Sequence, residues 1–209
     1  MSRLRLSVVA AFAMAVLAIY VTAAPGGTPS LGQFDPARLA DLETRMWKAY
    51  YAKENVRLFG LLTTMLREQY HYSWVTATRE AFHLARAAST FGNLKSGYEQ
   101  VLPDLEAGYT TAKASIGGRF DPDAVARAEL AWWVARRIPG KNSPDQVGDL
   151  IADEYAMLYD RPRKAVLRSA QLRAQAAALR DAEAGAPDWN EIGRLLAGSY
   201  EALRAAVGS

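Results

Sequence analysis

Hydrophobic side chains recur every three or four positions along most of the chain from residue 35 onward. This spacing is the period of an amphipathic α-helix, and no segment shows the strict alternation of a half-buried strand. The pattern predicts about seven helices. They cover residues 36–70, 74–91, 98–116, 122–138, 144–159 and 162–184, and a last helix begins at residue 189.

Capping residues support these boundaries. Asp35-Pro36 and Asp121-Pro122 each place an acidic N-cap before a proline, and Ser143-Pro144 opens a capping box. We therefore predict an all-α fold, a multi-helix bundle of about seven helices. A short helical-repeat solenoid is the alternative, because residues 147–160 and the alanine-rich helix behind them resemble a tetratricopeptide hairpin. A fixed repeat length is missing, which favours the bundle.

The first apolar run, Leu6 to Ala24, carries no charge and follows Arg3 and Arg5. As a helix it would rise about 28 Å, close to the hydrocarbon thickness of a bilayer. Its end, Val21-Thr22-Ala23, has the small residues that precede a signal-peptidase cut. We therefore expect residues 1–24 to be a signal peptide or an N-terminal transmembrane anchor.

A tract rich in proline and glycine separates this run from the rest of the chain. We expect residues 25–34 to be a flexible linker and residues 35–209 to form an extracytoplasmic domain on the periplasmic side. The protein would then be either single-pass membrane-anchored or secreted. Packing of the apolar run into the core of the domain is the alternative, and the tract argues against it.

Composition excludes several kinds of chemistry. The chain has no cysteine, which removes disulfides, thiolate nucleophiles and thiolate metal sites. Its formal net charge is +3, and the two arginines of the leader account for most of that surplus. A nearly neutral domain gives no electrostatic reason to expect a nucleic acid partner. The sequence also lacks a Gly-x-Ser-x-Gly elbow, a phosphate loop and a dinucleotide fingerprint, so it gives no sign of catalysis.

Acidic residues fall inside the apolar stripes of the predicted helices, at Glu43, Glu54, Glu129 and Glu154. Glu129 and Glu154 stand equally far from the predicted turn at residues 139–142. They should therefore lie level with each other and face a shared interior. Buried carboxylates must share a proton, bind a cation or find an arginine or tyrosine partner, and we favour such a structural partner.

A metal site is the alternative for these acids. Glu80 and His83 have the Glu-x-x-His spacing that places both side chains on one side of a helix. With two of the acids above they make a predicted set of metal ligands. This set is Glu80, His83, Glu129 and Glu154, with Glu43 or Glu54 as a further ligand.

This set resembles part of the ligand set of ferritin-like di-iron bundles. The resemblance implies a pair of iron or manganese ions bridged by carboxylates, with His83 as the single nitrogen ligand. It covers only these few positions. Met157 stands where the family's second histidine would follow Glu154, which weakens the comparison.

Two further features suggest binding surfaces. Aromatic residues around the 139–142 turn could line an apolar pocket, although ordinary core packing is favoured for them. They are Trp132, Trp133, Tyr155 and Tyr159. The helix near residue 162 is rich in basic residues that could face anionic lipid or an acidic partner, although a solvated face is favoured. They are Arg161, Arg163, Lys164, Arg168, Arg173 and Arg180.

Together these features favour a binding or scaffold module in the cell envelope. Its expected partner is another envelope protein or the membrane surface. We expect no catalytic residue and no cofactor. Two alternatives stay open: a helical-bundle metal enzyme that uses iron or manganese, and a carrier for an apolar small molecule.

Overall fold

The computed structural model describes residues 26–208 and, ahead of them, Met14, Ala18 and residues 21–23. This part of the chain contains α-helices and one short 3-10 helix, without any strand, so the all-α prediction is confirmed. In chain order the elements are α2 (Pro36–Tyr51), α3 (Asn55–Gln69), α4 (Trp74–Asn93), η1 (Tyr98–Val101), α5 (Leu102–Ile116), α6 (Pro122–Ala135), α7 (Pro144–Tyr159), α8 (Arg163–Ala182) and α9 (Trp189–Val207).

Polar caps begin the helices where the sequence predicts them. The Asp35 carboxylate accepts hydrogen bonds from the backbone N–H groups of Ala37 and Arg38, at 2.9 and 3.1 Å. The Ser143 hydroxyl accepts one from the backbone N–H of Gln146 at 3.3 Å. Each cap satisfies a backbone donor that has no partner within its helix. The predicted helix over residues 144–159 has the same bounds as α7.

The predicted single helix over residues 36–70 is wrong, because the chain turns between α2 and α3. Lys53 adopts a positive φ of 58°. The backbone N–H of Glu54 then donates to the carbonyl of Ala49 at 2.9 Å, which closes the last turn of α2. This is the usual geometry of a helix C-terminus, with lysine in the position that glycine commonly takes. The domain therefore has one helix more than predicted.

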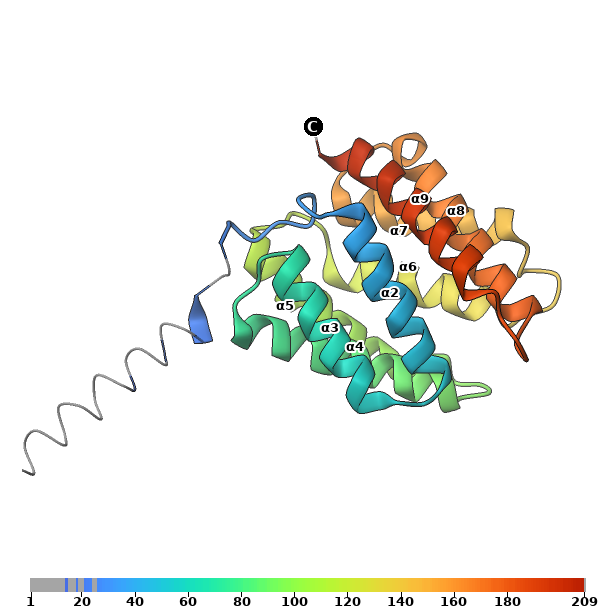
Figure 1. Cartoon of the computed structure of the whole chain (residues 1–209), viewed down its shortest axis with the longest axis horizontal. Coiled ribbons are helices and arrows are strands. Elements are labelled where there is room, and N and C mark those ends of the chain that lie inside the picture. Colours follow the sequence, from blue (N-terminus) through green and yellow to red (C-terminus); the bar gives the residue numbers. More distant parts are fainter. Residues whose placement is uncertain (1–13, 15–17, 19–20, 24–25, 209) are drawn as a thin grey trace, which may run out of the picture.

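The helices form a closed ring (Figure 1). Each one packs against its neighbours in the chain, and α9 returns to pack against α2. In Figure 1, helices α3 to α5 lie on one side and α7 to α9 on the other, with α2 and α6 between the two groups. Contact between the first and last of these helices makes the arrangement a closed bundle rather than an open solenoid.

Two arginines hold together one end of the ring. Arg136, at the end of α6, donates to the hydroxyl of Tyr51 at the end of α2 and to the carboxylate of Asp181 near the end of α8, each at 2.9 Å. Arg137 donates to the carbonyl of Leu94, the C-cap of α4, at 2.7 Å. The C-termini of α2, α4, α6 and α8 therefore meet here. The partial negative charge of helix C-termini favours arginine at this position.

Small residues let α7, α8 and α9 approach one another closely. A Cβ atom on Gly148 of α7 would lie 3.1 Å from the Cα atom of Gln171 on α8. The hydroxyl oxygens of Ser169 on α8 and Ser199 on α9 are 3.1 Å apart, and Ser199 also donates to the carbonyl of Ser169 at 2.9 Å. These contacts fix α8 between its neighbours and set the direction of its inward-facing side chains.

Most of the predicted leader, residues 1–24, lies outside the residues that the structure describes, so the expected signal peptide or anchor stays a prediction. Among the described residues, none of the helices has both the length and the hydropathy that a membrane crossing requires. The end of the predicted linker packs against the domain. Leu31 and Phe34 are buried, and the backbone N–H of Ser30 donates to the carbonyl of Tyr70 at 3.2 Å.

Candidate functional site

The ring of helices surrounds a cavity of about 430 Å³ that is partly open to solvent. Every helix from α2 to α9 contributes at least one residue to its lining. Protein interiors are normally packed without voids larger than a water molecule, so a cavity of this size is an unusual feature of a core. Its volume falls within the range of sites that bind small molecules.

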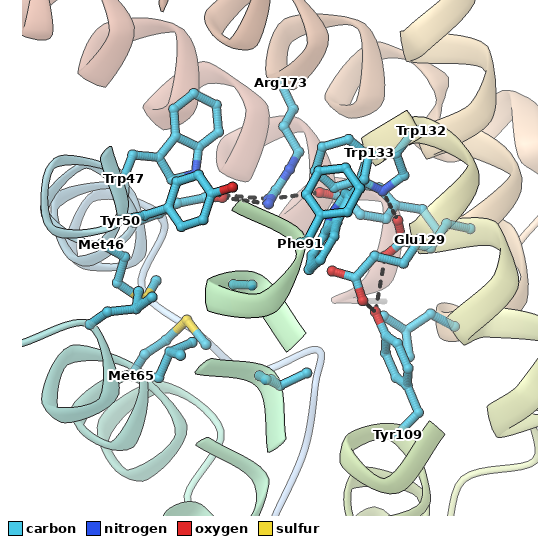
Figure 2. A pocket seen from close by; sticks show the side chains of 18 of the residues that line it. Met46, Trp47, Tyr50, Met65, Phe91, Tyr109, Glu129, Trp132, Trp133 and Arg173 are labelled. Carbon is cyan, nitrogen blue, oxygen red and sulfur yellow. Dashed lines mark hydrogen bonds and ion pairs between the residues drawn. The ribbon is translucent and has the colours of Figure 1, made fainter. Parts of the chain in front are cut away.

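The cavity has an apolar wall and a polar wall. Apolar side chains of α2, α3 and α4 form the apolar wall, which includes Met46, Leu58, Leu62, Met65 and Leu84, although α2 and α4 also contribute the carboxyl groups of Glu43 and Glu80. Carboxyl, hydroxyl and indole groups of α5, α6 and α7 face them, together with Arg173 from α8. Figure 2 shows Met46 and Met65 on one side of the space and Glu129, Trp132 and Tyr109 on the other.

Glu43 and Arg173 form a buried ion pair on the polar side. Nη2 of Arg173 lies 2.5 Å from Oε1 of Glu43, and its Nη1 donates to Oε2 at 3.1 Å. The indole of Trp47 and the hydroxyl of Tyr200 also donate to Glu43, and Nη1 of Arg173 donates to the hydroxyl of Tyr155 at 3.2 Å. Burial opposes the charge on Arg173, but Glu43 beside it offsets this and keeps its pKa above the usual range. Both charges of this pair are therefore balanced within the protein.

Glu129 and Glu154 lie close together and form an acidic pair. Within the described chain neither has a salt-bridge partner. The hydroxyl of Tyr109 lies between them, 2.7 Å from Oε2 of Glu129 and 3.3 Å from Oε1 of Glu154. The indole N–H of Trp132 donates to Oε2 of Glu154 at 2.5 Å. Oε1 of Glu129 accepts no hydrogen bond from any described residue. This pair therefore has an unused acceptor on the cavity wall.

Burial changes the acidity of this pair. It raises the pKa of Glu129 to about 7, although the hydrogen bond from Tyr109 acts in the opposite direction. Burial, followed by the nearby charge of Glu129, raises the pKa of Glu154 to about 8. Two carboxyl groups this close cannot both ionise readily, so the pair retains at least one proton near neutral pH.

Glu80 is a third carboxyl group on the cavity wall without a cationic partner among the described residues. Its side chain is only 5% exposed, and Oε2 is buried without a hydrogen-bond partner. Burial raises its pKa well above the usual range. The hydroxyl of Tyr72 is also buried without a hydrogen-bond partner. Since buried polar groups are nearly always hydrogen-bonded, Glu80 has an unused capacity that a bound molecule could satisfy.

The structure does not gather the predicted metal ligands at one point. His83 lies outside the cavity lining, with Nδ1 2.9 Å from Oδ1 of Asp104, and Arg86 binds the same carboxylate. Burial opposes the ionisation of Asp104, yet Arg86 and His83 together lower its pKa. Glu54 is exposed and pairs with Arg57 at 2.8 Å. Within the described part of the chain, no group of three or more histidine, aspartate or glutamate side chains is arranged to hold a metal ion.

Other predicted positions do come together. Glu129 and Glu154 lie level with each other, as expected, because one hydroxyl, that of Tyr109, reaches both. The four aromatic residues of the predicted pocket also line the cavity. They are Trp132, Trp133, Tyr155 and Tyr159.

The predicted basic face of α8 is partly used inside the protein. Arg173 turns into the cavity, and the guanidinium of Arg180 lies 3.3 Å from the ring centre of Tyr51. Arg163 pairs with Asp149 and Asp153 on α7, each at 2.6 Å. The sequence does contain one indication that Arg173 faces the interior: its position continues the buried stripe of small and apolar residues on α8. These are Val166, Ala170 and Ala177.

Comparison with known proteins does not assign the chain to a family. No protein-family model, curated protein or solved structure matches the chain. Any function must therefore be argued from the cavity itself.

Proposed function

We propose that this protein is a helical domain that binds a small molecule with an apolar body inside its ring. The observation that carries this proposal is the cavity of about 430 Å³ lined by every helix from α2 to α9. A mostly apolar lining with a few polar groups that fix orientation is typical of ligand sites.

Unsatisfied polar groups support the same proposal. An empty cavity formed only by imperfect packing would be lined by apolar side chains. This one also presents the unpartnered carboxyl group of Glu80 and a free acceptor on Glu129. Leaving such groups without partners costs stability, and a ligand that supplies the missing hydrogen bonds removes that cost.

The ligand would enter at the end of the ring where the four helix C-termini meet. Asp181, which is exposed, and Arg136 and Arg137 line the cavity there. Tyr50 and Tyr51 are partly exposed at the same end. The expected extracytoplasmic location and the expected protein partner stay predictions. They are compatible with a carrier or sensor of small molecules.

A bulky residue placed in the cavity tests this function. Phenylnaphthylamine is a neutral aromatic probe that becomes fluorescent in apolar sites, and it should bind saturably to the purified protein. Ala88→Trp on α4 and Leu62→Trp on α3 fill the cavity from two helices and should each weaken binding by about tenfold or more, which is about 1.4 kcal/mol. Native mass spectrometry of the same samples would reveal a co-purified ligand.

Ala131→Trp is the matched control, because Ala131 is exposed on α6 and lies outside the cavity lining. It should leave probe binding unchanged. Circular dichroism identifies any variant that fails to fold, and either cavity variant suffices for the test. Unchanged binding in both folded cavity variants would contradict the proposal.

A further inference from the structure

We propose that the cavity selects an organic amine, whose ammonium group binds at Glu129 and Glu154 while its apolar body lies against α3 and α4. This inference rests on the proposed small-molecule function. It names the chemical class of the ligand from the charges and hydrogen-bond partners inside the ring.

The charges of the cavity wall are unequal. Five carboxyl groups line the cavity, and they are those of Glu43, Glu80, Glu129, Glu154 and Asp181. Arg173 pairs with Glu43, and Arg136 pairs with Asp181. Three carboxyl groups are therefore left without a cationic partner in the described chain. A ligand that carries a positive charge would balance what the protein leaves unbalanced.

The unused atoms of the carboxyl groups call for a donor. Oε1 of Glu129 and Oε2 of Glu80 have no hydrogen-bond partner among the described residues, and the unpartnered donor of the lining, Nε of Arg173, belongs to a guanidinium whose charge is balanced by Glu43. An ammonium group carries three donors and no acceptor, so it matches this wall. Glu80 is an independent example of an unpartnered carboxyl group, because it belongs to α4 and its Oε2 is buried without a hydrogen-bond partner. It offers a place for a second donor of the ligand.

Aromatic rings stand beside the pair. Trp132 binds Glu154 directly, the ring of Trp133 lies 6.1 Å from that of Trp132, and the ring of Phe91 lies 5.0 Å from that of Trp133. Figure 2 shows these rings near Glu129 on one side of the space. A cation is attracted to the faces of aromatic rings, particularly where water is excluded. Arg137 lies over the ring of Phe91 at 3.7 Å and Arg173 over that of Trp132 at 5.6 Å, so Trp133 is the ring of the three that a ligand's ammonium group would use.

The arginines of the cavity do not favour an anionic ligand instead. Nη1 and Nη2 of Arg173 are bound to Glu43 and to tyrosine hydroxyls; its Nε is buried without a hydrogen-bond partner in the described chain, but the charge of the guanidinium is balanced by Glu43. Arg136 is bound to Tyr51 and Asp181, and Arg137 to the carbonyl of Leu94. A carboxylate ligand beside Glu129 and Glu154 would add a further negative charge to a pair that already resists ionisation, so it is disfavoured there.

Amine binding should be coupled to the protons of the pair. An ammonium group favours the ionised form of Glu129 and Glu154, so it displaces protons that the empty site retains. Affinity should therefore rise with pH across the range where the pair titrates. The titratable or charged groups that face the pair come from every neighbouring element and belong to Tyr109 on α5, Tyr155 and Tyr159 on α7, Arg173 on α8 and Glu43 on α2.

A set of ligands with one chain and three head groups tests the inference. Octylamine, octanol and octanoate are each used to displace phenylnaphthylamine from the intact protein. We expect octylamine to displace the probe at about tenfold lower concentration than either of the others, because charge-assisted hydrogen bonds are about twice as strong as neutral ones. The affinity for octylamine should also rise between about pH 6 and about pH 8.

The double variant Glu129→Gln/Glu154→Gln should reduce the ratio of octylamine affinity to octanol affinity by about tenfold. It should also abolish the pH dependence of that ratio. Glu106→Gln is the matched control, since Glu106 is exposed on α5 and lies outside the cavity lining, and it should change neither. If the double variant does not fold, Glu129→Gln alone serves the same comparison.

The possible outcomes separate the two proposals. If octanol or octanoate competes as well as octylamine, the amine inference is wrong and the small-molecule function stands. If the probe and all three ligands fail to bind, both proposals are wrong. A preference for octylamine that persists unchanged in the folded double variant would also overturn the inference.

Discussion

Two acidic clusters share the polar side of the cavity, and they differ in what the protein supplies to them. Glu43 has Arg173 and two further donors, and both of its oxygens are engaged. Glu129 and Glu154 have a tyrosine hydroxyl and an indole, and no salt-bridge partner in the described chain. In the first cluster both oxygens of Glu43 are bound and the charges are balanced without a ligand, although Nε of Arg173 is buried without a hydrogen-bond partner among the described residues; the ion pair links α2 to α8. The second is incomplete and depends on protons or on a bound cation.

This comparison separates structural from functional burial of charge. A buried carboxylate with a complete set of partners holds the fold in one arrangement, and its loss is expressed as lost stability. A buried carboxylate with an unused acceptor lowers stability when it ionises, and such a cost persists where it serves binding. The predictions below test whether the two clusters divide in this way.

The largest effect is expected from Arg173→Met, which removes the cation but keeps most of the side-chain volume. Glu43 would then be buried without its partner, and the free energy of unfolding should fall by about 3–5 kcal/mol. Chemical denaturation measures this change. Arg168→Met on the exposed face of the same helix should change stability by about 0.5 kcal/mol or less.

Equal losses in the two variants would show that the Glu43–Arg173 pair does not hold the ring. The double change Glu43→Met/Arg173→Met sharpens the result. It leaves no unpaired charge, so it should recover part of the stability that Arg173→Met alone removes.

A smaller effect is expected from pH on the second cluster. Because the pKa values of Glu129 and Glu154 are raised in the folded state, the folded protein binds more protons than the unfolded chain above about pH 4.5. Stability from these groups is therefore present at low pH and lost as pH rises to about 8. For Glu129 alone, whose pKa rises from 4.5 to about 7, the loss should be on the order of 3 kcal/mol, since one pKa unit corresponds to about 1.4 kcal/mol.

Glu154→Gln should flatten this decline, because glutamine resembles the protonated acid and cannot ionise. Denaturation curves at a series of pH values, compared with those of Glu106→Gln, measure the difference. A decline of the same size in Glu154→Gln would assign the pH dependence to other groups.

The smallest effect is expected from Tyr109→Phe, which removes the hydroxyl between the two carboxyl groups. Stability should fall by about 1 kcal/mol, the usual value of one hydrogen bond. The pKa of Glu129 should rise further, because the lost hydrogen bond favours its ionised form. Tyr98→Phe, at a partly exposed hydroxyl that donates to the carbonyl of Lys95, should change stability less and leave the pH dependence unchanged.

Local sequence signals predicted the helices, and they predicted that Glu129 and Glu154 lie at the same height on neighbouring helices. Caps such as Asp35 and Ser143 act through bonds within a few residues, and the short turn after α6 fixes the register of α7. The break at Lys53 was missed because its signal is weak. Glycine usually marks such a turn, and a lysine there carries no comparable signature.

The cavity and its partners could not be read from local patterns. Closure of the ring depends on α9 packing against α2, which joins residues far apart in the sequence. The inward direction of Arg173 was missed because arginines on alanine-rich helices usually extend to solvent. Glu43 and its partner Arg173 are 130 positions apart in the chain, a separation at which sequence periodicity gives no information.

Calorimetric titration of octylamine near pH 7, in buffers that differ in their enthalpy of protonation, tests the central claim most directly. The account predicts heats that depend on the buffer and correspond to about one proton released per amine bound, and no such dependence in Glu129→Gln/Glu154→Gln. Tight amine binding to the unaltered protein with heats that are the same in every buffer would contradict it.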